Sequence, residues 1–160
     1  MEVLHWLKAL PWIVSVRESA WQYPVIETLH GIGMGLLVGT LTVMSLRLIG
    51  GLRRMPFSTL RGLAPLVWTG LAINACTGVV MFMTDGPRLV TNWIFGAKML
   101  LIAVGLGVAV TLQRRIAGAE PRWSAGEAVA RNTRMLSVAC LLVWYGAIVA
   151  GRVTAFLGDQ

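Results

Sequence analysis

Four long apolar runs dominate the chain, at residues 23–49, 63–83, 93–112 and 135–157. Each run is long enough to cross the hydrocarbon core of a bilayer, which takes about 20 apolar residues in a helix. Only 13% of the 160 residues are charged, and a soluble domain of this length could not bury so much apolar surface in one core. The alternating ten-residue segments of a membrane β-barrel are absent from the sequence. The sequence therefore predicts an all-α integral membrane protein, a four-helix up-down bundle with short connections.

Basic residues gather in two of the three connections between the runs. The first of these holds Arg47, Arg53, Arg54 and Arg61, and the second holds Arg114, Arg115, Arg122, Arg131 and Arg134 against Glu120 and Glu127. This is the positive-inside pattern, so we expect both connections in the cytoplasm, both termini outside, and a multi-pass location in a bacterial inner (plasma) membrane. The net charge of +7 follows the same pattern, which indicates the lipid bilayer and not nucleic acid as the partner.

Residues 1–21 form a separate amphipathic segment before the predicted bundle of residues 22–160. Leu4, Leu7 and Leu10 recur at helical spacing, with His5 and Lys8 on the opposite side. We expect an interfacial helix on the outer surface, kinked at Pro11, and the alternative is a cleaved signal peptide.

Small and polar residues occur at helical spacing within the first two runs. Gly31, Gly35 and Gly39 are four residues apart, a pattern typical of close helix packing or of a flat face against a planar ligand. In the second run, Asn74 and Thr77 share a face, and we expect them to form hydrogen bonds between helices.

Arg47 lies near the inner end of the first run and can extend to the membrane surface. Four other charged or titratable polar residues lie within the runs, where charges are costly and often functional: Glu27, His30, Lys98 and Arg152. At 1.5 Å of rise per residue, His30, Lys98 and Arg152 all lie roughly 8–10 Å from the outer surface. Glu27 is one turn outward of His30 on the same helix face. The four residues are therefore expected to meet in one layer of the outer leaflet, contributed by three different helices.

Two explanations of this layer remain open. In the first, Glu27 pairs with Lys98 or Arg152, and His30 hydrogen-bonds among them. In the second, His30 is a metal ligand whose other ring nitrogen is oriented by a neighbour. A neutral Lys98 amine can also bind iron, and Arg152 is suited to an anion such as a haem propionate. Met34, four residues after His30, offers a thioether that would suit copper(I) instead.

Beyond residue 20 the chain resembles an uncharacterised bacterial family of four-helix inner-membrane proteins, through the segments IETLHGIGMGLLVGTLTVMSLRLIG, PLVWTGLAINACTGVVMFM and NWIFGAKMLLIAVGLG. It is more distantly similar to the copper-resistance D membrane proteins and the four-helix bacterial protoporphyrinogen oxidases. In those oxidases a His of the first span and a Lys of the third are held to be axial ligands of haem b, which correspond to His30 and Lys98. Further matches are Arg47, Pro65, Trp68 and, with one gap residue different, Gly70.

The resemblance implies a haem-b-binding or redox membrane protein with axial ligands from the first and third spans. A membrane oxidoreductase activity would need an electron-transfer partner. Porphyrinogen oxidation itself is not expected, because this chain carries an additional segment before its first span. Two alternatives remain: a copper-handling protein that uses His30 and Met34, and a non-catalytic subunit of a membrane complex.

Overall fold

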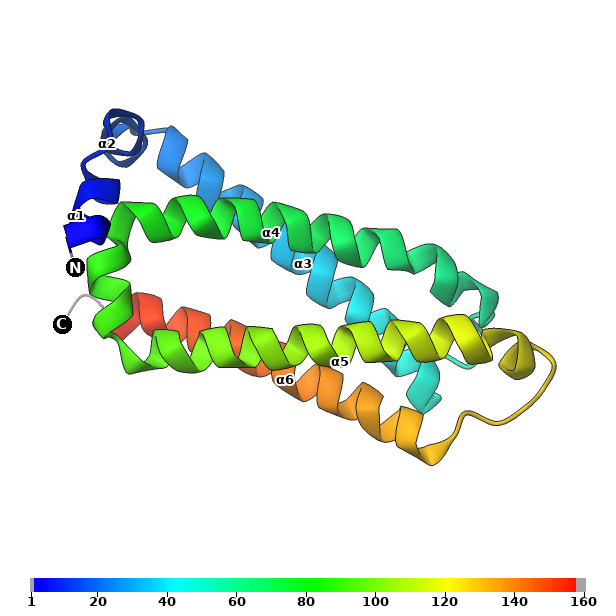
Figure 1. Ribbon diagram of the computed structural model, residues 1–160. Helices are drawn as coiled ribbons and strands as arrows, with labels where there is room; N and C mark the ends of the chain where they lie inside the picture. Colours follow the sequence, from blue (N-terminus) through cyan, green and yellow to red (C-terminus); the bar gives the residue numbers. More distant parts are fainter. Residues whose placement is uncertain (1, 158–160) are drawn as a thin grey trace.

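A computed structural model describes residues 2–157, which form six α-helices and contain no strand (Figure 1). The helices are α1 (Glu2–Lys8), α2 (Pro11–Glu18), α3 (Gln22–Ile49), α4 (Ser58–Thr91), α5 (Trp93–Ser124) and α6 (Arg131–Leu157). Helices α3 to α6 are each long and apolar enough to cross a membrane. The prediction of an all-α protein with four membrane-spanning helices is confirmed.

The four long helices are arranged as two tightly packed pairs. Helix α3 makes most of its contacts with α4, and α5 makes most of its contacts with α6. Contacts of α3 with α6, and of α4 with α5, are fewer. This order places α3 and α5 at opposite corners of the bundle, so a group held by both helices would lie between the two pairs.

The bundle has two chemically different ends (Figure 1). At one end, α1 and α2 pack against α4 and the start of α3, and α6 finishes at this same end, which we call the terminal end. The other end carries the connections 50–57 and 125–130 with their neighbouring arginines, and we call it the basic end. An outward-facing terminal end, with both termini outside, remains a prediction from the positive-inside pattern.

The helices extend beyond the apolar runs that predicted them. Helix α4 covers residues 58–91 where the sequence predicted 63–83, and α5 continues to Ser124 where the prediction ended at residue 112. Hydropathy falls where charges begin, but a helix continues until its backbone is capped. Helix α3 ends at Gly50, whose φ of 102° favours glycine. Helix α5 begins where the Asn92 side chain accepts a hydrogen bond from the backbone N–H of Ile94 at 2.9 Å.

The close approach of α3 and α4 depends on two glycines outside the predicted stripe. A Cβ added at Gly70 would lie 2.5 Å from the backbone nitrogen of Leu37, and one added at Gly33 would lie 2.9 Å from that of Asn74. By contrast, the stripe of Gly31, Gly35 and Gly39 is exposed, and an added Cβ there would meet nothing within 4 Å in the described structure. The prediction that this stripe forms a packing face is therefore wrong within the single chain, because the helix turns its other side toward α4.

Helix α4 bends near the terminal end, at Asp85. Its φ of −142° and ψ of 25° are not helical, and Pro87, two residues later, has no N–H to continue the ladder. The last turns of α4 consequently bend toward the start of α5 (Figure 1). Helix α1 packs beside this bend, where Lys8 Nζ lies 3.6 Å from Asp85 Oδ1. The predicted N-terminal segment is thus helical, and it breaks before Pro11, where α2 begins.

Candidate functional site

A cavity of about 170 Å³ lies between the helix pairs at the terminal end. Three of the four predicted site residues line it: Glu27 and His30 from α3, and Lys98 from α5. The remaining lining residues are Tyr23, Gly78, Met81, Phe82, Asp85, Arg88, Leu89, Phe95, Gly151 and Thr154. All four long helices therefore contribute to one site, with His30 and Lys98 on opposite corners.

The His30 imidazole is held in one orientation by α4. Its Nδ1 lies 2.9 Å from Thr77 Oγ1, and the Thr77 hydroxyl lies 2.7 Å from the carbonyl oxygen of Ile73. In the tautomer that carries its proton on Nδ1, the Thr77 hydroxyl accepts from Nδ1–H and directs its own hydrogen to the Ile73 carbonyl. Nε2 then carries the lone pair, which is the state of a histidine prepared to bind a metal.

Two further features of α4 support this position of His30. The side-chain amide of Asn74 donates to the backbone carbonyl of His30 at 3.0 Å. Gly78 lies against the ring, because a Cβ at that position would be 3.3 Å from His30 Cε1. The predicted interhelical hydrogen bonds of Asn74 and Thr77 are therefore confirmed, and both converge on His30.

Lys98 is half-buried against the backbone of α6. A Cβ at Gly151 would lie 3.5 Å from Lys98 Nζ, so this glycine leaves the space that the amine occupies. Within the described residues, Lys98 Nζ has no ion pair within 4.0 Å and no hydrogen bond. An amine between helices without a carboxylate partner is available to a ligand that enters the cavity.

The predicted ion-pair cluster is not formed in the part of the chain that the structure describes. Glu27 lines the cavity mouth and is exposed, but it pairs with neither Lys98 nor Arg152. Arg152 is exposed and does not line the cavity, although its neighbour Gly151 does. The structure thus brings together Glu27, His30 and Lys98, and it leaves Arg152 at the side of the site.

The thioether proposed for copper is also not at the cavity. Met34 packs against the hydrophobic core, whereas Met81 of α4 lines the cavity with His30. Among the described residues, no group of three or more His, Cys, Asp or Glu side chains is placed to hold a metal ion. A metal at this site would therefore depend on His30 together with an amine, a thioether or a ligand of its own.

Sequence reasoning missed the polar residues at the cavity mouth. Asp85 and Arg88 lie outside the predicted runs 63–83 and 93–112, but α4 continues through them. Arg88 Nε donates to Asp85 Oδ2. Arg88 lines the cavity and Arg152 does not, so the guanidinium at this site is that of Arg88. The spacing of three residues between Asp85 and Arg88 was the signal available, since it places both on one helix face. Tyr23 was predicted only as the first residue of the first apolar run, and its place in the cavity lining was missed.

Part of the cavity lining is apolar. Phe82 of α4 and Phe95 of α5 stack with ring centroids 5.9 Å apart and an interplanar angle of 15°. With Met81 and Leu89, they form an apolar surface next to the two nitrogen ligand candidates. The lining offers imidazole and amine donors together with carboxylate, phenol and guanidinium groups.

Comparison with known protein families, with curated proteins and with solved structures finds no match to this chain. The family resemblance described from the sequence remains a prediction, and the site has to be interpreted from its own geometry.

Proposed function

We propose that the chain is a haem-b-binding redox protein of the membrane, in which His30 and Lys98 would hold the haem iron. One observation supports this most strongly: the two side chains come from opposite corners of the bundle into one cavity, and neither is engaged in an ion pair among the described residues. Bundle cores commonly hold cofactors through side chains on facing helices. When bound, haem would supply one-electron transfer, at a potential set by its ligands and surroundings.

The His30 imidazole and the Lys98 amine are suitable ligands for haem iron. The cavity in the present conformation is too small for a haem. Ligand pockets usually have volumes of about 300–1,000 Å³, and a tetrapyrrole is larger than the 170 Å³ found here. Binding would require the α3–α4 pair to separate from the α5–α6 pair at the terminal end. Contacts between the pairs are fewer than contacts within them, so we expect the bundle to open between the pairs.

The residues of the chain would have separate roles. Thr77 holds the Nδ1 proton of His30, so that Nε2 faces the site. Gly78 and Gly151 leave space for the imidazole and the amine. Arg88 is the guanidinium at the mouth and is suited to a carboxylate group of the ligand. Arg152 remains a predicted propionate partner, which it could reach only from the exposed side of α6.

Expression with ample haem and a visible spectrum of the purified protein test the proposal. We expect a Soret band that His30→Ala abolishes. Lys98→Met should keep a six-coordinate but altered spectrum, because a thioether is a soft axial donor. Lys98→Arg should lose the low-spin spectrum, because a guanidinium stays protonated and cannot bind iron.

The same measurements separate the alternatives. If the wild-type protein is colourless and binds copper(I) through His30, the result favours a copper-handling protein. Met81 is then the thioether that lines the cavity. A colourless protein that binds neither, but copurifies with a second membrane protein, would indicate a non-catalytic subunit. A Soret band unchanged in His30→Ala would refute the proposed ligands. The inner-membrane location and an oxidoreductase activity belong to the same proposal.

A further inference from the structure

A second and larger cavity lies at the basic end of the bundle, on the face between α4 and α5. Its volume is about 500 Å³, and it is separate from the His30 site in its lining residues. The lining consists of Met44, Leu60, Arg61, Ala64, Trp68, Val110, Gln113, Arg114, Ile116 and Ala117. Helices α4 and α5 make few contacts with each other, which leaves room for this cavity.

The apolar part of the cavity is suited to a hydrocarbon chain. Met44, Leu60 and Ile116 are almost completely buried at its floor. Trp68 remains 42% exposed, although it lies within a membrane-spanning helix. The cavity therefore connects a buried apolar floor with a side of the bundle that faces lipid.

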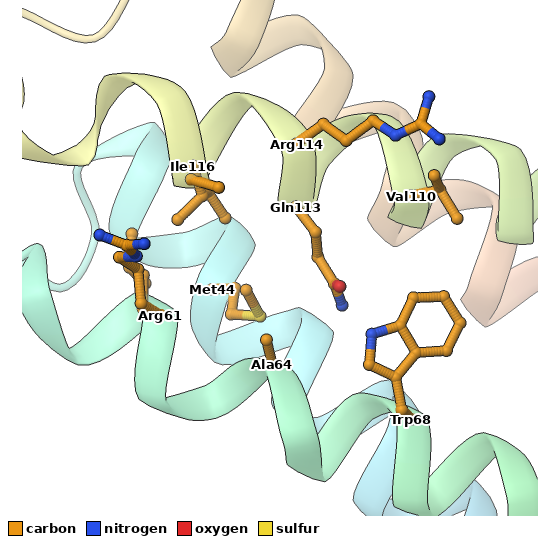
Figure 2. A pocket seen from close by; sticks show the side chains of 10 residues that line it. Met44, Arg61, Ala64, Trp68, Val110, Gln113, Arg114 and Ile116 are labelled. Carbon is orange, nitrogen blue, oxygen red and sulfur yellow. The ribbon is translucent and has the colours of Figure 1, made fainter.

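Two side chains with hydrogen-bond donors, Gln113 and Trp68, line this apolar space. Gln113 of α5 and Trp68 of α4 extend toward each other across the cavity, with the ring nitrogen of Trp68 on the side of Gln113 (Figure 2). Gln113 Nε2 is buried and has no hydrogen-bond partner among the described residues. A buried amide donor without an acceptor is destabilising, so an acceptor oxygen that approaches this nitrogen is stabilised.

Positive charge borders the same cavity. Arg61 extends from α4 toward Ile116 at one edge, and Arg114 lies along the outer side of α5 (Figure 2). Both are exposed, and neither has an ion pair with a described carboxylate. Basic pockets between membrane helices bind anionic lipid head groups.

We propose that this cavity binds one anionic glycerophospholipid from the surrounding bilayer. The phosphate lies at Arg61, an ester carbonyl accepts from Gln113 Nε2, and an acyl chain covers the apolar floor and passes Trp68. This ligand class has the three required parts in order along one molecule: a charged head, buried acceptor oxygens and a hydrocarbon chain. A free phosphate would contact only the arginine. A hydrocarbon would contact only the apolar floor of the cavity.

Native mass spectrometry of the full chain in detergent tests this proposal. The protein is titrated with phosphatidylglycerol, and in parallel with phosphatidylcholine of the same acyl chains. We expect one phosphatidylglycerol to bind roughly tenfold more tightly than phosphatidylcholine, because both carry a phosphate but Arg61 and Arg114 repel the choline ammonium of the second lipid. Arg61→Gln should remove this preference, and Gln113→Leu should weaken both lipids severalfold.

Arg54→Gln is the matched control, since it removes the same charge from the basic end outside the cavity. It should change the affinity less than twofold. Equal binding of the two lipids, an equal effect of Arg54→Gln, or competition by inorganic phosphate alone would each overturn the proposal. Tighter binding of a neutral isoprenoid quinone through Gln113 would also overturn it and assign a neutral redox lipid. Circular dichroism of each variant confirms that the helices remain folded.

Discussion

Thr77 controls the His30 imidazole through a single hydroxyl group. The hydroxyl lies within hydrogen-bond distance of both the Ile73 carbonyl and His30 Nδ1, so it holds the orientation of the ring. This hydrogen bond joins α3 and α4 at the depth of the cavity. This hydrogen bond stabilises the fold even when no cofactor is bound.

Thr77→Val keeps the size of the side chain but removes the hydroxyl. We expect the free energy of unfolding in detergent to fall by about 1–3 kcal/mol, because Nδ1 is left without a partner in a half-buried place. Thr77→Ser retains the hydroxyl and should restore most of the loss. If His30 binds haem, Thr77→Val should also release haem faster than Thr77→Ser. Equal stability of the valine variant and the wild type would show that His30 does not depend on Thr77.

At the scale of the helices, the α3–α4 contact is decided by two positions that have no side chain. Gly33 and Gly70 allow the two backbones to approach so closely that either Cβ would contact backbone atoms. The same contact places Asn74 and Thr77 beside His30. The crossing of α3 and α4 therefore determines both how these helices pack and where the site residues lie.

Gly70→Ala should destabilise the bundle, because its Cβ would lie 2.5 Å from the Leu37 nitrogen and the helices must move apart. We expect a loss of about 1–3 kcal/mol in the free energy of unfolding, typical of overpacking. Gly39→Ala is the matched control on α3, where the added Cβ meets open space. That change should be neutral or stabilising by up to about 1 kcal/mol, since alanine favours helix. A reversed order of the two variants would contradict the crossing described here.

For the whole molecule, charge determines how the bundle is expected to lie in the membrane. The terminal end carries α1, α2 and the candidate cofactor site, and the basic end carries most of the arginines. The positive-inside rule places the basic end in the cytoplasm. The cofactor site would then lie near the outer surface, and the proposed lipid cavity in the inner leaflet.

Alkaline phosphatase fusions test this orientation, because the enzyme is active only outside the cytoplasm of bacteria. A fusion after the C-terminus should be active, and a fusion within the connection 125–130 should be inactive. A reporter that is active only in the cytoplasm, placed at the same two positions, provides the control. The opposite pattern of activities would invert the bundle and place the His30 site in the inner leaflet.

The sequence by itself determined the class of fold and the layer of the site. Apolar runs long enough to span a bilayer leave helices as the solution, so the four spans followed from hydropathy alone. Because helical rise is constant, depth can also be counted along the chain, and this placed Glu27, His30 and Lys98 at one level. The interhelical roles of Asn74 and Thr77 followed from polar groups that must be satisfied in lipid.

Only the tertiary structure decided which faces meet. The depth of a residue in the membrane does not determine how its helix is rotated about its own axis. That rotation depends on how side chains and backbone fit between neighbouring helices. That rotation directed Gly33 toward α4 and left Gly31, Gly35 and Gly39 exposed. The bend of α4 brought Arg88 to the cavity, and the rotation of α6 turned Gly151 toward Lys98 while Arg152 stayed outside. The lipid-facing cavity was likewise invisible in the sequence, because it arises from weak packing between two helices and not from any motif.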